Sequence, residues 1–242
     1  MEAARVAPGM RVLDLASGPG EPALTLARVV GPRGHVVASD IVPEMVAIAR
    51  EQAEARRLTN MSLDVVDAQR LPFASSSFDA GACRFGIAHV PDYGRALAEM
   101  RRVLKPGGRA AFVVWGPRDQ NPYFTLVDEV LTPYPAPAPT TPRGPGPFTF
   151  AKAGSLRRAL LAAGFKDVEE AAHSVILSWP GSADNAWQGR RELSASTTSR
   201  LASLTTTEQD RIGGAMAARL RAYEHDGQVG LPALIIGAAG MA

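Results

Sequence analysis

The sequence predicts an α/β fold with a mainly parallel sheet, and three observations carry this prediction. Up to about Gly116, short β-branched or apolar runs alternate with amphipathic stretches, which is the pattern of βαβ units. A turn with two glycines, at residues 17–20, joins the first apolar run to a helical stretch. The chain has 242 residues, 46% of them hydrophobic, and is long enough to bury a core without metal ions or disulfides.

The first half is predicted to supply five strands with helices between them. The strands are expected at residues 11–16, 35–40, 62–66, 78–84 and 109–115. The helices are expected at residues 21–30, 43–58 and 92–104. The run Lys105-Pro106-Gly107-Gly108 is predicted to end the third helix and to turn the chain, because proline and glycine both interrupt helices.

The second half has a different composition, since nine of the nineteen prolines lie between Pro117 and Pro147. We expect irregular structure there, with one short helix at 123–131. Further on we expect a helix at 155–163, a strand at 174–179, two helices within 183–223 and a last buried strand at 231–237. The chain is therefore predicted to divide into a core at 1–116, inserted segments at 117–226 with a helix and a sixth strand among them, and a closing strand at 227–242.

Charge and cysteine content exclude several classes of protein. The 26 basic and 24 acidic residues are not clustered, which argues against a nucleic-acid partner. No signal peptide and no apolar run of membrane-span length is found, so a cytoplasmic location is the default expectation. The single cysteine, Cys83, excludes a disulfide framework and a CxxC zinc site, and no metal is predicted. A homodimer is one compatible assembly.

The segment VLDLASGPG at residues 12–20 is the first motif that carries chemistry. Glycines after a strand let backbone amides approach a ligand, and the following helix N-terminus favours an anionic group. Gly18, Gly20 and Ala23 also match the spacing G-x-G-x-x-A of dinucleotide-binding proteins, which is a weak signal by itself. The alternative interpretation is a tight structural turn.

Asp40 lies at the end of the next predicted strand, twenty residues after Gly20. A carboxylate at this position can accept hydrogen bonds from both hydroxyls of a ribose. It therefore indicates an adenosine cofactor, without separating a nicotinamide dinucleotide from S-adenosylmethionine.

The third motif, DAQRLPF at residues 67–73, leads through three serines to Phe78-Asp79. With it the sequence resembles the class I S-adenosylmethionine-dependent methyltransferases, specifically the methyltransferase type 11 domains of ubiquinone and menaquinone biosynthesis. The resemblance rests on VLDLASGPG, the acid at Asp40, DAQRLPFASSSFD and ALAEMRRVLKPGGRAAFVVW, in that order, and covers residues 10–116. It implies a Rossmann-like, doubly wound sheet of seven strands whose last strand is antiparallel, with an α-helical cap from the C-terminal half.

The resemblance also implies roles for individual residues in binding S-adenosylmethionine. The methionine part would be surrounded by Asp14, Ala16, Ser17, Gly18 and Gly20, the ribose by Asp40, and the adenine by Ile41, Met45, Asp67 and Ala68, while Arg84, Phe85 and Gly86 would line the opening towards the methyl group. The pair Ala16-Ser17 departs from the family, which often has glycine and then cysteine or another small residue. The backbone amides of this turn are expected to hold the cofactor all the same.

Methyl transfer from a sulfonium depends on in-line positioning and exclusion of water, and a base is needed only if the acceptor must lose a proton. His89 is the candidate base, because it follows the fourth strand at the carboxyl edge of the sheet, where ligands bind in such folds. The alternative is a histidine that packs against or caps the next helix. Tyr123 and Asp119 are weaker candidates.

An apolar substrate pocket is expected around Gly86, His89, Trp115, Tyr123, Phe124 and Trp187. Trp115 and Trp179 are more often core residues, whereas Trp187, in a polar context, is the tryptophan expected to face a ligand. Because the first motif begins at residue 12, a cover over the methyl group is expected from residues 117–147 and 183–223, unless the chain is truncated.

These inferences predict methyl transfer from S-adenosylmethionine to a small, fairly apolar molecule, at carbon, oxygen or nitrogen. Two alternatives stay open. One is an NAD(P)-dependent oxidoreductase, which the G-x-G-x-x-A spacing permits but which gives the Asp67-Ala68 segment no role. The other is a non-catalytic scaffold of the same fold that binds the cofactor.

Overall fold

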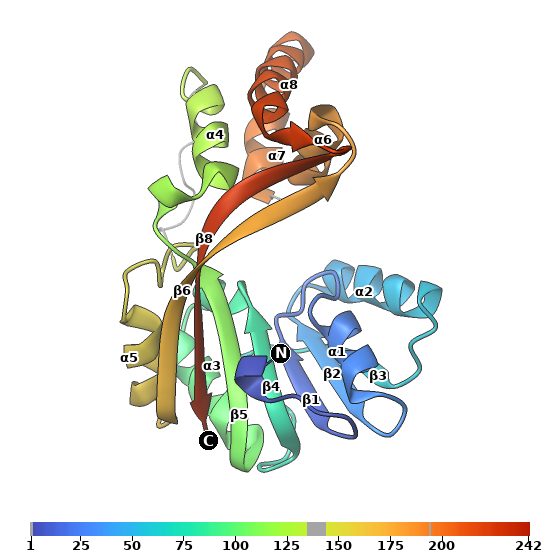
Figure 1. Ribbon diagram of the computed structural model, residues 1–242, viewed down its shortest axis with the longest axis vertical. Coiled ribbons are helices and arrows are strands. Elements are labelled where there is room, and N and C mark those ends of the chain that lie inside the picture. Colours follow the sequence, from blue (N-terminus) through green and yellow to red (C-terminus); the bar gives the residue numbers. More distant parts are fainter. Residues whose placement is uncertain (1, 135–143, 194) are drawn as a thin grey trace. The chain divides into compact units, whose positions relative to one another are not determined.

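The computed structural model describes residues 2–134, 144–193 and 195–242 (Figure 1). The chain forms two compact units. The first, called the core unit below, comprises Met1–Gly116, Gly144–His173 and Ile235–Ala242. The second unit comprises Pro117–Arg143 and Ser174–Leu234.

One sheet contains the strands of the core unit, and its order confirms the predicted fold class. Seven strands follow one another as β3-β2-β1-β4-β5-β8-β6, and the two-residue β7 pairs with β8. Strands β1 to β5 pair in parallel, whereas β8 runs antiparallel to β5. The bounds are β1 Arg11–Leu15, β2 His35–Asp40, β3 Met61–Val65, β4 Phe78–Arg84, β5 Leu104–Trp115, β6 Lys166–Pro180, β7 Glu224–His225 and β8 Gln228–Met241.

Side chains alternate between the two faces of this sheet, and helices cover both. On β1, Val12 packs with Leu26 and Val30 of α1, whereas Leu13 points into the cluster that contains Leu97 of α3 and Leu156 of α5. Parallel strands need cover on both faces, which is why their sequences are almost continuously apolar. The helices of the core unit are α1 Ala23–Val30, α2 Pro43–Ala55, α3 Tyr93–Val103 and α5 Ser155–Ala162, with short 3₁₀ turns η1 Glu2–Ala4 and η2 Gly86–His89.

Most elements of the first half lie within a few residues of their predicted bounds, except that β5 begins at Leu104 and not at residue 109. Helix α3 ends at Val103, just before the Lys105–Gly108 run that is predicted to end it. The run after α3 continues as part of β5, which pairs with β4 from Leu104 onward. The register shifts between Phe78 and Ala80, so the glycines lie at an irregularity of the strand pair. Gly107 has a φ of +81°, which glycine adopts without the Cβ clash of other residues. The helix thus ends where predicted, and the following run forms the irregular start of β5 where only a turn was expected.

The predicted division of the second half needs correction. Residues 144–173 belong to the core unit, although the sequence placed them among the inserted segments. The reason is packing: Leu156 and Leu160 of α5 are completely buried against the same cluster as Phe112 of β5. Strands β6 and β8 are also longer than the expected 174–179 and 231–237. Residues 135–143 of the proline-rich stretch lie outside the described residues.

The second unit has its own apolar core, around Trp187, Leu201, Ile212 and Met216. Three α-helices, not two, lie between residues 183 and 220 of its described part. Its helices are α4 Pro122–Leu131, α6 Ala183–Leu193, α7 Ala195–Ala202 and α8 Thr206–Leu220, with 3₁₀ turns η3 Arg118–Gln120 and η4 Arg221–Tyr223. None of the helices in the described residues is long and apolar enough to cross a membrane.

Candidate active site

A cavity of about 280 Å³ opens at the carboxyl ends of β1, β2, β3 and β4, all within the core unit. This edge of a parallel sheet is where α/β proteins bind ligands. The cavity is lined by Ala16, Asp40, Ile41, Val42, Val66, Asp67, Ala68, Gln69, Gly86, His89, Val90 and Pro91. Seven of the predicted site residues are among them, namely Ala16, Asp40, Ile41, Asp67, Ala68, Gly86 and His89.

Asp40 ends β2 and is held by two backbone amides. Gly18 N donates to its Oδ2 at 2.8 Å, and Val42 N donates to its Oδ1 at 3.0 Å. A carboxylate has about four lone-pair positions, so each oxygen can still accept one further hydrogen bond. The arrangement fits a diol ligand such as a ribose. At Gly18, a Cβ would meet no atom within 4 Å, so open space lies beside this acid.

Next to Asp40, the cavity wall is apolar and exposed. Ile41 is 62% exposed and Val42 is 39% exposed, although both follow a strand that is buried from Val36 to Asp40. Large aliphatic side chains exposed at the rim of a cavity are typical of a ligand-binding surface. These two residues fit the flat apolar face of an adenine.

In another part of the cavity wall, Gln69 holds Asp67 and links it to α3. Gln69 donates to Asp67 Oδ1 through its backbone N at 2.8 Å and its side-chain Nε2 at 3.0 Å, and Nε2 also lies 3.2 Å from Oδ2. Its Oε1 accepts from Asp92 N at 3.0 Å. The bonds from Gln69 hold the pKa of Asp67 below its usual value, so the carboxylate is ionised and acts only as an acceptor.

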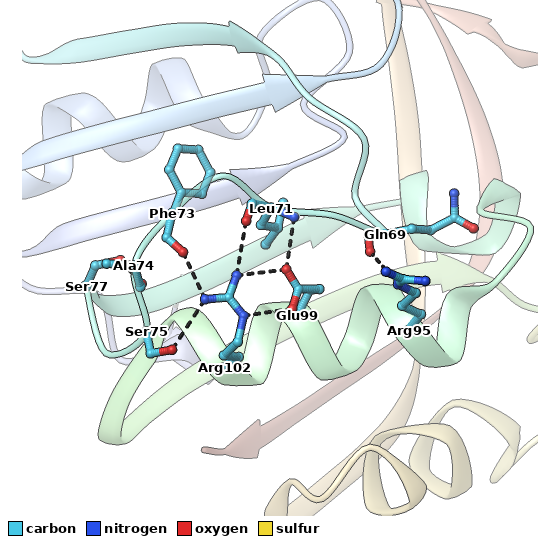
Figure 2. A network of polar contacts seen from close by, with 9 residues as sticks. All are labelled: Gln69, Leu71, Phe73, Ala74, Ser75, Ser77, Arg95, Glu99 and Arg102. Carbon is cyan, nitrogen blue, oxygen red and sulfur yellow. Dashed lines mark hydrogen bonds and ion pairs between the residues drawn. The ribbon is translucent and has the colours of Figure 1, made fainter.

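Helix α3 fixes the rest of this segment, as Figure 2 shows. Arg102 forms a two-pronged ion pair with Glu99, at 2.7 Å on both sides, and donates to the carbonyl oxygens of Leu71 at 3.0 Å and Phe73 at 2.9 Å. Glu99 Oε2 in turn accepts from Leu71 N at 2.9 Å. Arg95 Nε donates to Gln69 O. The motifs DAQRLPF and ALAEMRR are thus two halves of one polar network that positions the cavity wall.

The loops after β1 and β4 approach each other closely at the cavity. A Cβ at Gly86 would lie 2.3 Å from the Cβ of Ala16, so only glycine fits there. Ala16 has a φ of +54° and Phe85 has a φ of +65°, both in the left-handed region that favours glycine. Phe85 is stacked on Trp115, with ring centroids 4.3 Å apart and planes at 12°. Backbone strain of this kind gathers at binding sites.

The amides of the turn do not act as the sequence predicted. Ser17 N donates to Ser39 O, Gly18 N to Asp40 Oδ2 and Gly20 N to Ser17 O. They are therefore used inside the protein, and the amide of Gly18 holds the carboxylate of Asp40. Gly20 has a φ of +119°, and a Cβ there would lie 2.7 Å from Leu24 Cδ1, so both the backbone conformation and the packing of α1 favour glycine.

Asp14 is completely buried beneath this turn, and neither of its carboxyl oxygens has a hydrogen-bond partner among the described residues. Burial raises the pKa of Asp14 to about 8. An unsatisfied buried carboxyl costs free energy unless a donor reaches it. The amino group of a bound S-adenosylmethionine is a donor of the required kind, so this acid fits the group implied by the sequence.

His89 ends the 3₁₀ turn η2 and lines the same cavity as Asp40 and Asp67. Partial desolvation lowers the pKa of its imidazole below the usual value. The ring is therefore neutral at neutral pH and can accept a proton. Helix α3 is capped by Asp92, which accepts from Arg95 N at 2.9 Å, so the capping role considered for His89 belongs to Asp92.

The remaining predicted cofactor residues are not among those that line the cavity. Met45 lies on α2. Arg84 is exposed at the end of β4, and its guanidinium carbon lies 5.8 Å from the centroid of the Phe85 ring. Cys83 is buried, which raises the pKa of its thiol to about 12, so it is a core residue as expected. Among the described residues, no group of three His, Cys, Asp or Glu side chains is placed to hold a metal ion.

Three of the predicted substrate residues belong to the second unit. Tyr123 lines a small pocket there. The ring of Phe124 packs edge-on against the Tyr123 ring, with the two ring centroids 5.0 Å apart. Trp187 was expected to face a ligand, but it is 5% exposed and packs in the apolar core of this unit. Trp179, taken as a core residue from the sequence, lines the pocket and stacks on Tyr123 with planes at 5°.

Sequence reasoning missed Gln69, Arg102 and Arg190. Gln69 and Arg102 lie inside the quoted motifs, and the spacing Glu99-x-x-Arg102 on a helix was a usable signal for an ion pair. Nothing near Arg190 in the sequence marks it as a buried cation.

Comparison with known proteins agrees with this geometry. Residues 12–108 match a family model described as a methyltransferase domain. A demethylmenaquinone methyltransferase of Listeria monocytogenes is 40% identical over 113 residues, which are 47% of this chain and 48% of that protein. The ubiquinone/menaquinone biosynthesis C-methyltransferase of Bordetella avium is 44% identical over 106 residues, 44% of this chain and 41% of that protein.

Among solved structures, a putative methyltransferase from Bacillus halodurans is similar with a TM-score of 0.60 and 22% identity, covering 100% of this chain and 96% of that one. This likeness shows the fold. The chain spans about half the length of the curated relatives it matches. Residues 12–108 therefore form a methyltransferase domain of the class I S-adenosylmethionine-dependent type, related to the menaquinone and ubiquinone C-methyltransferases.

Proposed function

We propose that the protein transfers a methyl group from S-adenosylmethionine to a small, fairly apolar molecule. The observation that carries the proposal is the cavity of the core unit, where an acid placed for a ribose, an exposed aliphatic wall and an oriented second acid line one space. The named activity of the relatives, methylation in menaquinone and ubiquinone biosynthesis, is consistent with such an acceptor.

The residues of this cavity would divide the work of binding. Asp40 would accept from the ribose hydroxyls, Ile41 would cover the adenine face, and Asp67 would accept from the exocyclic amine. Asp14 would receive the amino group of the methionine part. When bound, S-adenosylmethionine supplies an activated methyl group on a positively charged sulfur, and the surrounding protein must align the acceptor and exclude water.

His89 is proposed as the base for an acceptor that must lose a proton. It lies in the same cavity and its lowered pKa leaves an imidazole nitrogen free to take the proton at neutral pH. If the acceptor is already a nucleophile, His89 has only a structural part to play.

Calorimetry on the whole chain tests the proposal. We expect S-adenosylmethionine and S-adenosylhomocysteine to bind the wild type, NAD and NADP to fail, and Asp40→Ala to weaken the two sulfur ligands at least tenfold. Binding of NAD without the sulfur ligands would overturn the methyltransferase assignment. Tight binding of the sulfur ligands with no transfer to a panel of phenols, quinols and amines would favour a non-catalytic scaffold.

The role of His89 needs a separate measurement. For His89→Ala we expect unchanged affinity for S-adenosylhomocysteine. We also expect a turnover rate that no longer rises with pH as the imidazole would lose its proton. His89→Gln is the control, since it keeps the size and a hydrogen-bonding group. Turnover that is unchanged across the pH range in both variants would remove His89 as a base.

A further inference from the structure

A second cavity of the core unit, called the arginine cavity below, has a volume of about 640 Å³. It is lined by Arg5, Arg109, Arg157, Leu161, Asp167, Val168, Glu169 and Met241, none of which lines the cavity of the candidate active site. Arg109 pairs with Ala80, near the start of β4, and with Met241, at the end of the antiparallel β8. In Figure 1 this end of β8 lies away from the arrowheads of β4 and β5. The arginine cavity is therefore at the amino edge of the parallel strands, and the candidate active site is at the opposite edge.

Arg109 is a buried cation at this cavity, with only 8% of its surface exposed. Its Nε donates to Ala3 O at 3.3 Å. Its two terminal nitrogens have no hydrogen-bond partner among the described residues, yet they are not completely shielded from solvent. No ion pair of the described part of the chain includes Arg109. A buried charge is costly unless it is paired, and an anion bound in the cavity would supply the partner.

Two further arginines reach the same cavity from other elements. Arg5 follows η1, and Arg157 lies on α5. Both are exposed, and neither takes part in an ion pair within residues 2–134, 144–193 and 195–242. Glu170, which lies on β6 beside α5, accepts from the backbone N atoms of Gly154 and Arg157 instead of pairing with a guanidinium. Three elements thus bring three guanidinium groups to one cavity without an acid that engages them.

The rest of the lining is suited to hydroxyl groups and to an aliphatic surface. Asp167 and Glu169 are two positions apart on β6, so their side chains lie on the same face of the strand. Both are exposed, and their carboxyl oxygens accept no hydrogen bond from the described residues, which leaves them available to hydroxyl donors. Leu161, Val168 and Met241 supply the apolar part of the wall, and Leu161 is 42% exposed.

The number of arginines favours a phosphate over a carboxylate. Three guanidinium groups offer more N–H donors than the two oxygens of one carboxylate accept, whereas a phosphate monoester presents three terminal oxygens. Arginine binds such groups through its planar fork of donors. A volume of about 640 Å³ is also within the range of pockets that hold small metabolites.

We infer that the arginine cavity binds a soluble polyol phosphate, such as a phosphorylated sugar. Arg5, Arg109 and Arg157 would hold the phosphate, and Asp167 and Glu169 would accept from the hydroxyl groups. This site is separate from the one proposed for S-adenosylmethionine, and its occupation requires no cofactor.

Glycerol 3-phosphate is the smallest probe that carries both chemical groups, and glycerol and inorganic phosphate each carry one of them. Binding to the whole chain is followed by the ¹³C resonance of the Met241 methyl group, assigned with Met241→Leu. We expect glycerol 3-phosphate to shift this resonance and to bind at least tenfold more tightly than glycerol and about threefold or more tightly than inorganic phosphate. No shift at Met241, or equal binding of glycerol, would overturn the inference. Inorganic phosphate that binds as tightly as glycerol 3-phosphate would leave an unselective anion site and overturn the polyol assignment.

Variants assign the binding to the arginines. Arg109→Met should weaken glycerol 3-phosphate at least tenfold and leave the affinity for S-adenosylhomocysteine unchanged. Because Arg109 is buried, Arg157→Met gives a second measurement at an exposed position and should weaken the probe about threefold or more. Arg158→Met is the matched control, since Arg158 is the exposed neighbour on α5 and does not line the cavity. Wild-type affinity in Arg157→Met, or an equal loss in Arg158→Met, would contradict the assignment.

A phosphate monoester also occurs as a lipid headgroup, and vesicles distinguish this source. Vesicles of phosphatidylcholine and phosphatidate in equal parts present the phosphate on a membrane surface. We expect the whole chain to sediment with them no more than with phosphatidylcholine alone. Sedimentation that requires phosphatidate and is lost in Arg109→Met would assign the cavity to a lipid headgroup and overturn the soluble ligand.

Discussion

The side-chain amide of Gln69 donates to Asp67 Oδ1 at 3.0 Å and lies 3.2 Å from its Oδ2. The carbonyl oxygen of the same amide accepts from the backbone of Asp92, which caps α3. One side chain therefore orients the proposed adenine-binding acid and ties it to the helix that follows His89. An acid held in this way presents its remaining lone pairs in a fixed direction.

Replacement of Gln69 by alanine should weaken binding of S-adenosylhomocysteine about threefold to tenfold. Without Gln69, the carboxylate of Asp67 loses about one net hydrogen bond. It must then be oriented when the ligand binds, and this lowers the affinity. Gln69→Glu should weaken it at least as much, because a second carboxylate would face Asp67. Calorimetry at constant pH measures both. Arg70→Ala, a change at the exposed neighbour, is the control and should bind as the wild type does; equal affinity of all four proteins would contradict the role of Gln69.

Arg102→Met should destabilise the core unit by about 1–3 kcal/mol. The substitution removes every donor that Arg102 offers to Glu99, Leu71 O and Phe73 O, and it leaves a half-buried carboxylate without its partner. Partial exposure of the pair keeps the effect in this range. Chemical denaturation measures it, with Arg101→Met on the exposed side of the same helix as the control. A loss no larger than that of the control would show that the network is not stabilising.

The core unit was largely predictable because its signals are local. Strands β2 and β4 have the bounds that their short apolar runs indicated, and Asp40 lines the cavity, as its position at the end of β2 predicted. A buried strand, a glycine turn and an acid at a strand end are each indicated by a pattern of a few consecutive residues.

What the sequence could not provide were contacts between distant residues. The amide of Gly18 points to Asp40 and not to a ligand, and Gln69 reaches Asp92, which is 23 positions away. The burial of Trp187 and Arg190 depends on how three helices of the second unit pack, and their polar sequence context suggested the opposite for Trp187. Local composition reports exposure poorly where a side chain is enclosed by remote segments.

The stability of the protein without ligand should fall as the pH rises from about 4 to 8, through Asp14. Its pKa is about 8 in the folded chain, against 3.8 for an ordinary aspartate, so the folded state holds a proton that the unfolded state has released. The contribution is full below the lower value and is lost as the pH approaches the higher one, by on the order of 1 kcal/mol per pH unit.

Asp14→Asn isolates this effect, because an amide has the shape of the protonated acid and does not titrate. Urea unfolding of both proteins at pH 5, 6, 7 and 8 should show the variant gaining stability relative to the wild type at each step. Parallel pH profiles for the two proteins would show that Asp14 is ionised in the fold throughout.

The close approach of Gly86 to Ala16 predicts a pair of substitutions that compensate each other. Gly86→Ala should cost about 1–3 kcal/mol of stability, because the new Cβ would lie 2.3 Å from the Cβ of Ala16. Ala16→Gly should be close to neutral, since glycine tolerates the φ of +54° at that position. In the double variant the clashing Cβ is gone, so the cost of Gly86→Ala should fall by about 1 kcal/mol or more. Thermal unfolding of the four proteins gives this coupling free energy directly. If the two effects simply add, the loops after β1 and β4 do not touch at these residues. The close contact of Ala16 and Gly86 in the cavity wall would then be wrong.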